Sequence, residues 1–291
     1  MGFFYASKNR DTLNGKPFAP ESITGRIMVN PHYSNITVPS GVKVIVDSGA
    51  FQLKFMKDRP DPSVSFGMQM AMERKIALRS GYPFRFEAVV IFDMLAGVDE
   101  AIVDGVRVKK RGTEETARYA IEETLKSAVY YDKHRCAFDG KIVFVAQGVT
   151  PDQYVGECVL PLMDIMRSDD WFAFGGFCII GKNRSLKPVF VETFRKALPV
   201  LKIKGVKRLH LLGVTVSDMV EFAFKEARKE GFEISTDSSS IEVNSVLGKV
   251  WDEETKKFVK VYGKEDKKVN YHPRDLAYVN TTKYDKWVNT L

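Results

Sequence analysis

The chain has 291 residues, of which 44% are hydrophobic and 12% aromatic, so it can bury a sizeable core and is not a disordered protein. Its formal net charge of +7 and its isoelectric point near 9.1 allow a polyanionic partner such as a nucleic acid, without requiring one. No apolar stretch approaches the roughly 18 residues of a membrane span, and the first residues lack the basic-then-apolar plan of a signal peptide.

The cysteines and histidines predict a reduced protein without a metal site. An odd number of cysteines argues against a disulfide framework, and their spacing matches no common zinc motif. They are Cys136, Cys158 and Cys178. The histidines also lack metal-ligand spacing, and we interpret them as structural or surface residues; they are His32, His134, His210 and His272. We therefore expect a cytoplasmic protein (in the host cytoplasm if the source is a virus) that needs no cofactor and no membrane.

Eight short runs of β-branched and aromatic residues predict eight strands. In chain order they cover residues 3–6, 26–30, 43–47, 88–93, 142–147, 172–175, 208–213 and 232–237. Helical patterns separate most of the later ones, at residues 65–79, 114–131, 151–166, 187–198 and 216–230. Ser217 is predicted to cap the last helix and Gly231 to end it. The alternation predicts an α/β fold, a (β/α)₈ TIM-type barrel, with a doubly wound sheet as the alternative.

The composition changes near Lys249, which divides the chain into a barrel domain at residues 1–248 and a charged, aromatic C-terminal extension at residues 249–291. The extension mixes lysines with aromatic residues, namely Trp251, Tyr262, Tyr271, Tyr284 and Trp287. Cations among aromatic rings suit phosphates and unstacked bases; a solvated surface with a few packed rings is the alternative. A second basic cluster is predicted to lie in a loop and to bind nucleic acid; its members are Arg107, Lys109, Lys110 and Arg111.

Three aspartates stand at the ends of predicted strands: Asp47, Asp93 and Asp237. Two further strands end in other polar or flexible residues, at Gln147 and at the pair Gly175 and Gly176. Packing of a barrel core does not explain why polar residues gather at one end of the strands. An active site at the C-terminal rim of the barrel explains it. For any one aspartate, a turn-forming role is the simpler alternative, and the two glycines could make a tight turn.

Five segments resemble, in order, the motifs of the tRNA-guanine transglycosylase superfamily. Residues 47–52 read Asp-Ser-Gly-Ala-Phe-Gln and are similar to the family's Asp-Ser-Gly-Gly-Phe/Tyr-Gln signature. The others are Phe-Asp at 92–93, Val-Ala-Gln-Gly at 145–148, Phe-Gly-Gly-Phe at 174–177 and Leu-Gly-Val-Thr at 212–215. Together they extend from residue 47 to residue 215, and the ordered set is more specific than any single motif.

The resemblance implies a barrel enzyme that exchanges guanine in a polynucleotide for a 7-deazaguanine through a covalent aspartyl–nucleic acid intermediate. It assigns Asp237 as the nucleophile and Asp47 as the general acid and base. It also assigns the residues that bind the flipped-out guanine. These are Asp93 and Gln147 on the edge of the base, Gly175 and Gly176 through their backbone, and Phe51 and Leu212 on its two faces.

Departures from the tRNA enzymes favour a DNA-modifying branch. No cysteine follows Cys178, so the family's C-terminal zinc site is absent, and the C-terminal tail differs. At the assigned nucleophile, Ser238 follows Asp237 where the family has a different sequence. The chain is therefore most similar to the phage and bacterial DNA-guanine transglycosylases. Lys182 stands near the position of a glutamate that accommodates an aminomethyl base, which favours 7-cyano-7-deazaguanine as the incoming base.

Three alternatives remain open from the sequence. The first is a queuosine- or archaeosine-type tRNA enzyme, and the second is a barrel hydrolase acting on free nucleosides. The third is an inactive nucleic-acid-binding paralogue, against which the presence of both Asp47 and Asp237 argues. The expected partners are DNA, or alternatively tRNA, and the free base.

Overall fold

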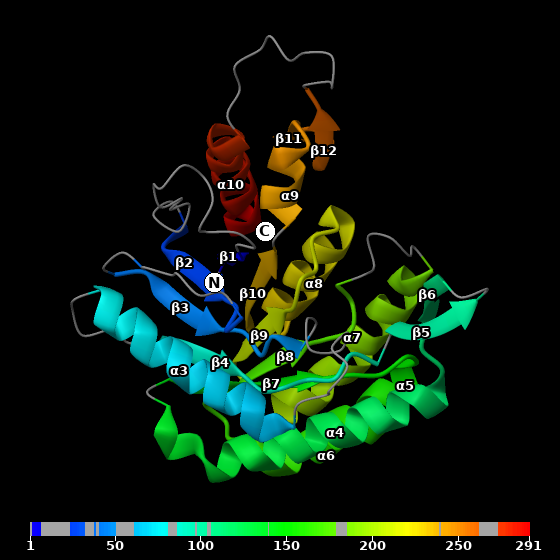
Figure 1. Ribbon diagram of the computed structural model, residues 1–291. Helices are drawn as coiled ribbons and strands as arrows, with labels where there is room; N and C mark the ends of the chain where they lie inside the picture. The colour runs from blue at the N-terminus through cyan, green and yellow to red at the C-terminus, as the bar shows by residue number, and fades with distance from the viewer. Residues whose placement is uncertain are drawn as a thin grey trace.

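Eight parallel strands close into a barrel in the computed structural model of this chain (Figure 1). The structure describes residues 2–6, 24–32, 38, 41–50, 61–80, 86–96, 98–103, 106–138, 140–178, 185–238, 240–261 and 273–291. The barrel strands are β1 (Gly2–Ala6), β2 (Arg26–Val29), β3 (Lys43–Val46), β4 (Phe86–Val90), β7 (Lys141–Ala146), β8 (Trp171–Phe174), β9 (Arg208–Leu211) and β10 (Glu233–Ser238). Each strand pairs with the next one along the chain, and β10 pairs with β1. The predicted TIM-type barrel is confirmed, and the doubly wound alternative is wrong.

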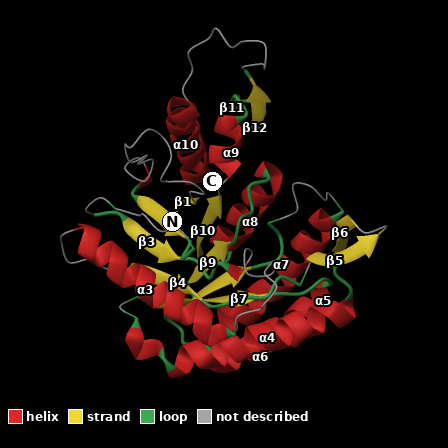
Figure 2. Cartoon of the chain, in the orientation of Figure 1, coloured by secondary structure: helices red, strands yellow, loops and turns green. Residues whose placement is uncertain are grey.

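Helices surround the barrel wherever the structure describes the connections (Figure 2). They are α3 (Pro62–Ser80), α4 (Glu114–Lys133), α5 (Pro151–Gln153), α6 (Leu160–Ile165), α7 (Leu186–Lys204), α8 (Ser217–Lys229), α9 (Ser240–Val246) and α10 (Pro273–Thr290), with a 3₁₀ turn η1 (Arg135–Ala137) and a π-helical segment η2 (Tyr154–Val159). Within these described parts of the chain, none of the helices has the length and apolarity needed to cross a membrane.

The predicted end of α8 is confirmed, and its predicted start is not. Gly231 adopts φ +86°, the left-handed conformation that follows a helix C-terminus. The N-cap, however, is Val216, whose side chain caps nothing, and Ser217 is the first residue within the helix. Val216 has the extended backbone of an N-cap, φ −71° and ψ 114°, because the preceding segment leaves the carboxyl end of β9. The predicted cap at Ser217 is therefore wrong by one residue.

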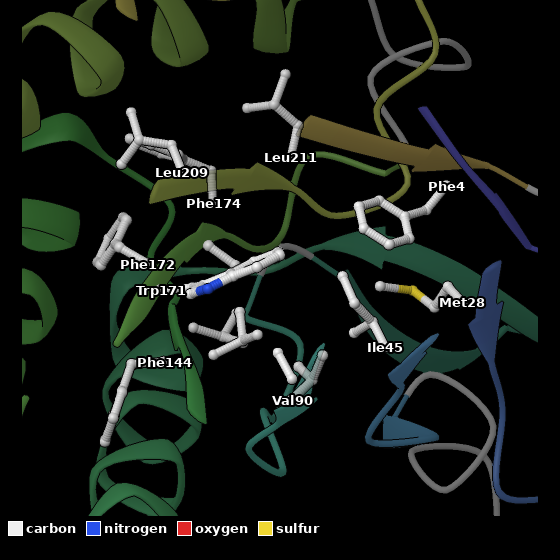
Figure 3. Packing of buried hydrophobic residues seen from close by; sticks show 14 of the residues in the cluster. Phe4, Met28, Ile45, Val90, Phe144, Trp171, Phe172, Phe174, Leu209 and Leu211 are labelled. Atoms are coloured by element: carbon white, nitrogen blue, oxygen red, sulfur yellow. The ribbon is translucent and has the colours of Figure 1, made fainter. Parts of the chain in front are cut away.

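Side chains of a barrel strand point alternately into the interior and toward the surrounding helices, as Figure 3 shows for Trp171 against Phe172 and Phe174 of β8. Trp171 lies inside the barrel and meets Phe4 edge-on, with ring centroids 6.4 Å apart. Phe174 points the other way and packs on Phe194 of α7, with centroids 4.6 Å apart. Each such fully buried ring contributes about 1.5–3 kcal/mol of stability. His210 shares the interior with Phe4, at a centroid distance of 5.9 Å.

The basic cluster at residues 107–111 lies in a strand, which corrects the prediction of a loop. Between β4 and α4 the chain forms an antiparallel hairpin of β5 (Val98–Val103) and β6 (Val106–Arg111), separate from the barrel sheet (Figure 1). β-branched valines alternate with basic residues in β6, which suits a strand. The register places Glu100 opposite Lys109 and Asp99 opposite Lys110. The two strands thus carry four basic residues against two acidic ones.

The C-terminal extension packs against the barrel. Its hairpin of β11 (Lys249–Asp252) and β12 (Lys257–Lys260) leads to α10, which packs against β1 and α9. Trp251, Tyr284 and Trp287 are buried together, with the Trp251 and Tyr284 ring centroids 4.8 Å apart. These rings form part of the core and are not free to stack on bases, so the stacking role considered for them from the sequence is wrong. The boundary at residue 248 stays a prediction.

Candidate active site

Asp47 follows β3 at the carboxyl end of the barrel, and both of its carboxyl oxygens accept a hydrogen bond. Oδ1 accepts from the backbone N–H of Ser48 at 2.8 Å, and Oδ2 accepts from Nδ2 of Asn30 at 3.1 Å. The Asn30 amide is oriented by the backbone N–H of His32, which donates to its Oδ1 at 3.0 Å. The Asp47 side chain keeps a small exposed fraction, so it is oriented and still reachable.

Burial raises the pKa of the Asp47 carboxyl to about 7, and the neighbouring charges of Asp93 and Asp237 act in the same direction. The hydrogen bonds from Ser48 and Asn30 act the opposite way on this pKa, because they stabilise the charged form. Asp47 consequently exchanges its proton near neutral pH. A carboxyl group with that property can serve as both acid and base in one reaction cycle.

Helix α3 holds the turn that carries Asp47. Ser65 donates from Oγ to the carbonyl of Ser48 at 2.8 Å, and Gln69 donates from Nε2 to the carbonyls of Asp47, at 3.0 Å, and of Val90, at 2.7 Å. Gln69 thereby joins the ends of β3 and β4. Tyr131 of α4 in turn donates its hydroxyl to Oε1 of Gln69. The side chains of Ser65, Gln69 and Tyr131 are all buried, so the turn is rigidly supported.

Asp93 lies beside this turn and forms a hydrogen bond with Gln147, the residue that follows β7. Its Oδ1 accepts from the hydroxyl of Ser48 at 2.9 Å, and its Oδ2 accepts from Nε2 of Gln147 at 2.7 Å. Burial raises the pKa of Asp93 to about 6, while these two hydrogen bonds lower it. Each carboxylate oxygen can accept a second hydrogen bond, so Asp93 retains capacity for donors on a bound molecule. Oε1 of Gln147 accepts from the N–H of Ala96 at 3.4 Å, which fixes the orientation of the amide.

Gly175 is required by its close approach to Gln147. A Cβ at this position would lie 2.3 Å from Nε2 of Gln147, which is shorter than any tolerated contact. The backbone N–H of Gly175 donates to the hydroxyl of Tyr154 at 3.1 Å, and that hydroxyl donates to the carbonyl of Ala146 at 2.8 Å. Gly176 has φ +81°, which favours glycine. The loop therefore brings backbone groups directly beside the Asp93–Gln147 pair.

The π-helical segment η2 supports this loop. Tyr154 and Cys158 lie four residues apart in η2, and Sγ of Cys158 accepts from the backbone N–H of Gln147 at 3.3 Å. Pro161 follows η2 and has no N–H to bond the carbonyl of Glu157, which removes one α-helical hydrogen bond from this stretch. Single π turns within helices often occur at functional sites.

Asp237 projects from β10 and has both of its hydrogen bonds on one oxygen. Oδ1 accepts from the backbone N–H of Gly213 at 2.8 Å and faces Nε2 of His210 at 3.2 Å. Among the described residues, none donates to Oδ2. Gly213 has φ +65°, and a Cβ there would lie 2.9 Å from Cβ of Cys178, so its N–H can point at Asp237 only because it is glycine. One carboxyl oxygen is held and the other is open.

The three carboxyl groups act on one another, and no lysine or arginine of the described parts of the chain forms an ion pair with them. Cys178 lies near all three: burial raises the pKa of its thiol to about 11, and the charges of Asp93, Asp237 and Asp47 add to that effect. The thiol is therefore neutral at physiological pH. In the part of the chain that the structure describes, no cluster of His, Cys, Asp or Glu side chains is arranged to hold a metal ion.

The structure brings most of the predicted site residues together at one end of the barrel. These are Asp47, Asp93, Gln147, Gly175, Gly176 and Asp237, with Leu212 partly buried beside them on the segment that leads to Gly213. Phe51 and Lys182 lie outside the described residues. The basic residues of the β5–β6 hairpin lie on a separate element, and the structure describes only their backbone.

Sequence reasoning missed several residues that hold the site together, among them Asn30, Gln69 and His210. Asn30 ends a predicted strand as the aspartates do, so the same rule could have found it. Gln69 lies within a helix and gives no comparable signal. His210 has no metal-ligand spacing, which is why the sequence suggests only a structural or surface role. Its place in β9 instead points its side chain inward, toward Asp237.

Two comparisons with known proteins do not assign this chain to a family. A scan against protein-family models finds no match, and neither does a search of curated proteins.

Proposed function

We propose that this protein is a transglycosylase that exchanges guanine in a polynucleotide for a 7-deazaguanine base. The observation that carries the proposal is the combination of an anchored carboxylate with one open oxygen, Asp237, and a carboxyl group poised to exchange a proton near pH 7, Asp47. Two carboxyl groups with these different environments are what substitution at an anomeric carbon requires. The order of the sequence motifs agrees with this chemistry.

In the first half of the reaction, Oδ2 of Asp237 attacks C1′ of the target nucleotide as the C1′–N9 bond to guanine breaks. Asp47 gives its proton to the departing guanine. In the second half, Asp47 takes a proton from the incoming base, whose N9 attacks C1′ and releases Asp237. Atoms and charge balance without a further reactant, and two successive inversions restore the original configuration.

Recognition of guanine falls to Asp93 in this proposal. Guanine presents adjacent N1–H and N2–H donors, and a carboxylate accepts such a pair through its two oxygens. The hydrogen bonds from Ser48 and Gln147 already orient the Asp93 carboxyl and leave acceptor capacity on both oxygens. Backbone groups of Gly175 and Gly176 lie beside Gln147 and can bind the remaining edge of the base. Adenine offers no matching donor pair, so it would be rejected.

DNA is the polymer we propose, with tRNA as the alternative. The β5–β6 hairpin leaves the carboxyl end of β4, so its excess of basic residues lies on the same side of the barrel as the three aspartates. Contacts of this kind position a nucleic acid and do not read its sequence. The target nucleotide must turn out of its stack to reach the carboxyl groups, at a cost of a few kcal/mol.

Base exchange with labelled guanine, measured on DNA and on tRNA in parallel, tests the proposal. We expect incorporation of label into DNA and no release of guanine from free nucleosides. Preferential exchange on tRNA would move the protein to the tRNA branch, and hydrolysis of free nucleosides would make it a hydrolase. Absence of exchange on every polymer, with the protein folded, would contradict the proposed function.

The incoming base is tested by competition between 7-cyano-7-deazaguanine and its aminomethyl counterpart. Lys182 would repel a protonated amine and tolerate a neutral nitrile, so we expect the cyano base to be incorporated preferentially. The matched variant Lys182→Glu should shift the preference toward the aminomethyl base. A wild-type preference for the aminomethyl base would contradict this assignment.

A further inference from the structure

His210 is a buried histidine inside the barrel whose two ring nitrogens both have defined partners. Nδ1 lies 2.8 Å from Oγ of Ser235, and Nε2 lies 3.2 Å from Oδ1 of Asp237. The ring is fully shielded from solvent, and Phe4 packs against it at a centroid distance of 5.9 Å. A side chain used only to fill the barrel would not need a polar partner on each side.

The contacts on both sides of the ring indicate which nitrogen carries the proton. Oδ1 of Asp237 already accepts from the N–H of Gly213, so Nε2 of His210 is the donor in its contact with that oxygen. The hydroxyl of Ser235 lies 2.8 Å from Nδ1 and 3.3 Å from the carbonyl of Leu209, and it can donate to Nδ1. A neutral imidazole that accepts at Nδ1 must carry its proton on Nε2. Nε2 then donates to Oδ1 of Asp237, on the same oxygen that accepts from the N–H of Gly213.

We propose that His210 is the positioning residue for Asp237: with Gly213 it holds Oδ1, so that Oδ2 is the oxygen that attacks the anomeric carbon. The hydrogen bonds run from Ser235 through His210 to Asp237. Two donors on one oxygen stop rotation of the carboxyl group and leave the second oxygen facing the site. The identity of the attacked carbon rests on the proposed function, whereas the hydrogen-bonded arrangement does not.

Three variants separate this role from packing. His210→Gln keeps an N–H donor near the position of Nε2, His210→Phe keeps an aromatic ring without a donor, and Ser235→Ala removes the hydroxyl that can donate to Nδ1. A hydrogen bond to a charged group corresponds to about a 10- to 100-fold effect. We expect His210→Phe to slow formation of the covalent adduct by that factor in single-turnover experiments, with the KM for polynucleotide unchanged.

His210→Gln should recover most of the lost rate, and Ser235→Ala should fall between wild type and His210→Phe. Phe4→Leu is the matched control, because it loosens the packing around the ring without removing a hydrogen bond. It should lower the unfolding temperature and leave the rate of adduct formation unchanged. A wild-type rate in His210→Phe, or equal slowing in Phe4→Leu at similar loss of stability, would overturn the positioning role.

A spectroscopic measurement keeps this inference distinct from the proposed function. If the wild-type protein forms no adduct with any polynucleotide, the proposed function fails. The His210 arrangement is then tested by ¹⁵N NMR of the imidazole, where we expect the Nε2–H form in the wild type and a mixture of tautomers in Ser235→Ala. An Nδ1–H tautomer in the wild type would overturn the inference whatever the activity.

Discussion

Both ends of the barrel carry charged side chains, but at the amino end these side chains form ion pairs with one another and at the carboxyl end, as far as the structure describes the chain, they do not. At the amino end, Arg208 bonds Glu233 at 3.1 Å and Glu87 at 3.3 Å, and Lys43 also reaches Glu87 at 3.3 Å. The guanidinium of Arg208 additionally lies 5.2 Å from the ring centroid of Trp171. At the carboxyl end, three aspartates face one another without a lysine or arginine partner among the described residues. The amino end neutralises its charges, and the carboxyl end leaves them unbalanced.

The same strands build both ends. Residues two apart in a strand share a face, so the interior face of β3 carries Lys43 at the amino end and Asp47 just beyond its carboxyl end. The interior face of β10 carries Glu233, Ser235 and Asp237 in the same order. Apolar or uncharged residues separate the two charged layers. In the proposed function, stability and reactivity depend on opposite ends of one barrel, so we expect that each can be changed without the other.

Replacing Asp237, the proposed nucleophile, should have the largest effect on guanine exchange. Asp237→Asn is expected to reduce guanine exchange by about 10⁴- to 10⁶-fold, which is the scale seen when a nucleophile or its partner is removed from an enzyme. The substitution keeps the shape of the side chain and removes one of three mutually repelling charges, so stability should be retained. Exchange rate and thermal unfolding check this together. Near wild-type exchange by Asp237→Asn would contradict the assignment.

Removing the proton donor should have the next largest effect. Asp47→Asn is expected to slow exchange by roughly 10²–10⁴-fold, the usual contribution of a general acid or base. Because the pKa of Asp47 is raised to about 7, the wild-type rate of guanine departure should fall as pH increases through 7. Single-turnover rates measured from pH 5 to 9 should show this fall in the wild type and not in Asp47→Asn. A loss below about threefold would return Asp47 to a turn-forming role.

Replacing the basic residues of the β5–β6 hairpin should weaken DNA binding without changing which base is exchanged. Replacing Lys109, Lys110 and Arg111 together by glutamine should make DNA affinity less dependent on salt, by about 0.7 to 0.9 in log–log slope for each phosphate that is no longer neutralised. Filter binding across a salt series measures this slope. The charge-matched control replaces Lys202, Lys204 and Lys207, which lie near the amino end of β9. An equal loss in the control would show that net charge, and not the hairpin, is responsible.

The unpaired carboxyl groups at the carboxyl end of the barrel should also make the stability of the protein depend on pH. The pKa of Asp47 is higher in the folded protein than its ordinary value of 3.8, so its contribution to stability is present at pH values below about 4 and is lost as pH rises through about 7. Denaturant unfolding from pH 4 to 8 should therefore show a smaller decline for Asp47→Asn than for wild type. Asp152→Asn, at an exposed site, is the control and should leave the decline unchanged.

The smallest effect on activity should come from a substitution at the amino end of the barrel, where the charged side chains are paired. Arg208→Met breaks the ion pairs with Glu87 and Glu233 and should cost about 1 kcal/mol of unfolding free energy, since these pairs are partly exposed. Exchange should stay within about twofold of wild type, because distant sites act independently. A large loss of exchange at unchanged stability would break the comparison between the two ends.

Most of the eight barrel strands could be predicted because they are short, nearly continuous apolar runs, whereas β9 and β10 mix polar and apolar residues and are marked by their position after a helical pattern. The meeting of the aspartates could be predicted because parallel strands end at one rim. The β5–β6 hairpin could not be predicted, because residues 107–111 are mostly basic and a basic run is typical of a loop. Gln69 acts through two backbone carbonyls that only the closed barrel brings together, so no local signal marks it. Burial of Trp251 and Tyr284 depends on how α10 packs against β1, which no local pattern encodes.

The central claim is that the unbalanced end is a nucleophilic site for the polymer, and a trapped adduct tests it most directly. Wild-type protein incubated with guanine-containing DNA and denatured should yield a species with the mass of protein plus DNA minus guanine. Peptide mapping should place the bond on Asp237, and Asp237→Asn should give no such species. Exchange that proceeds without an adduct, or an adduct mapped to another residue, would contradict the account.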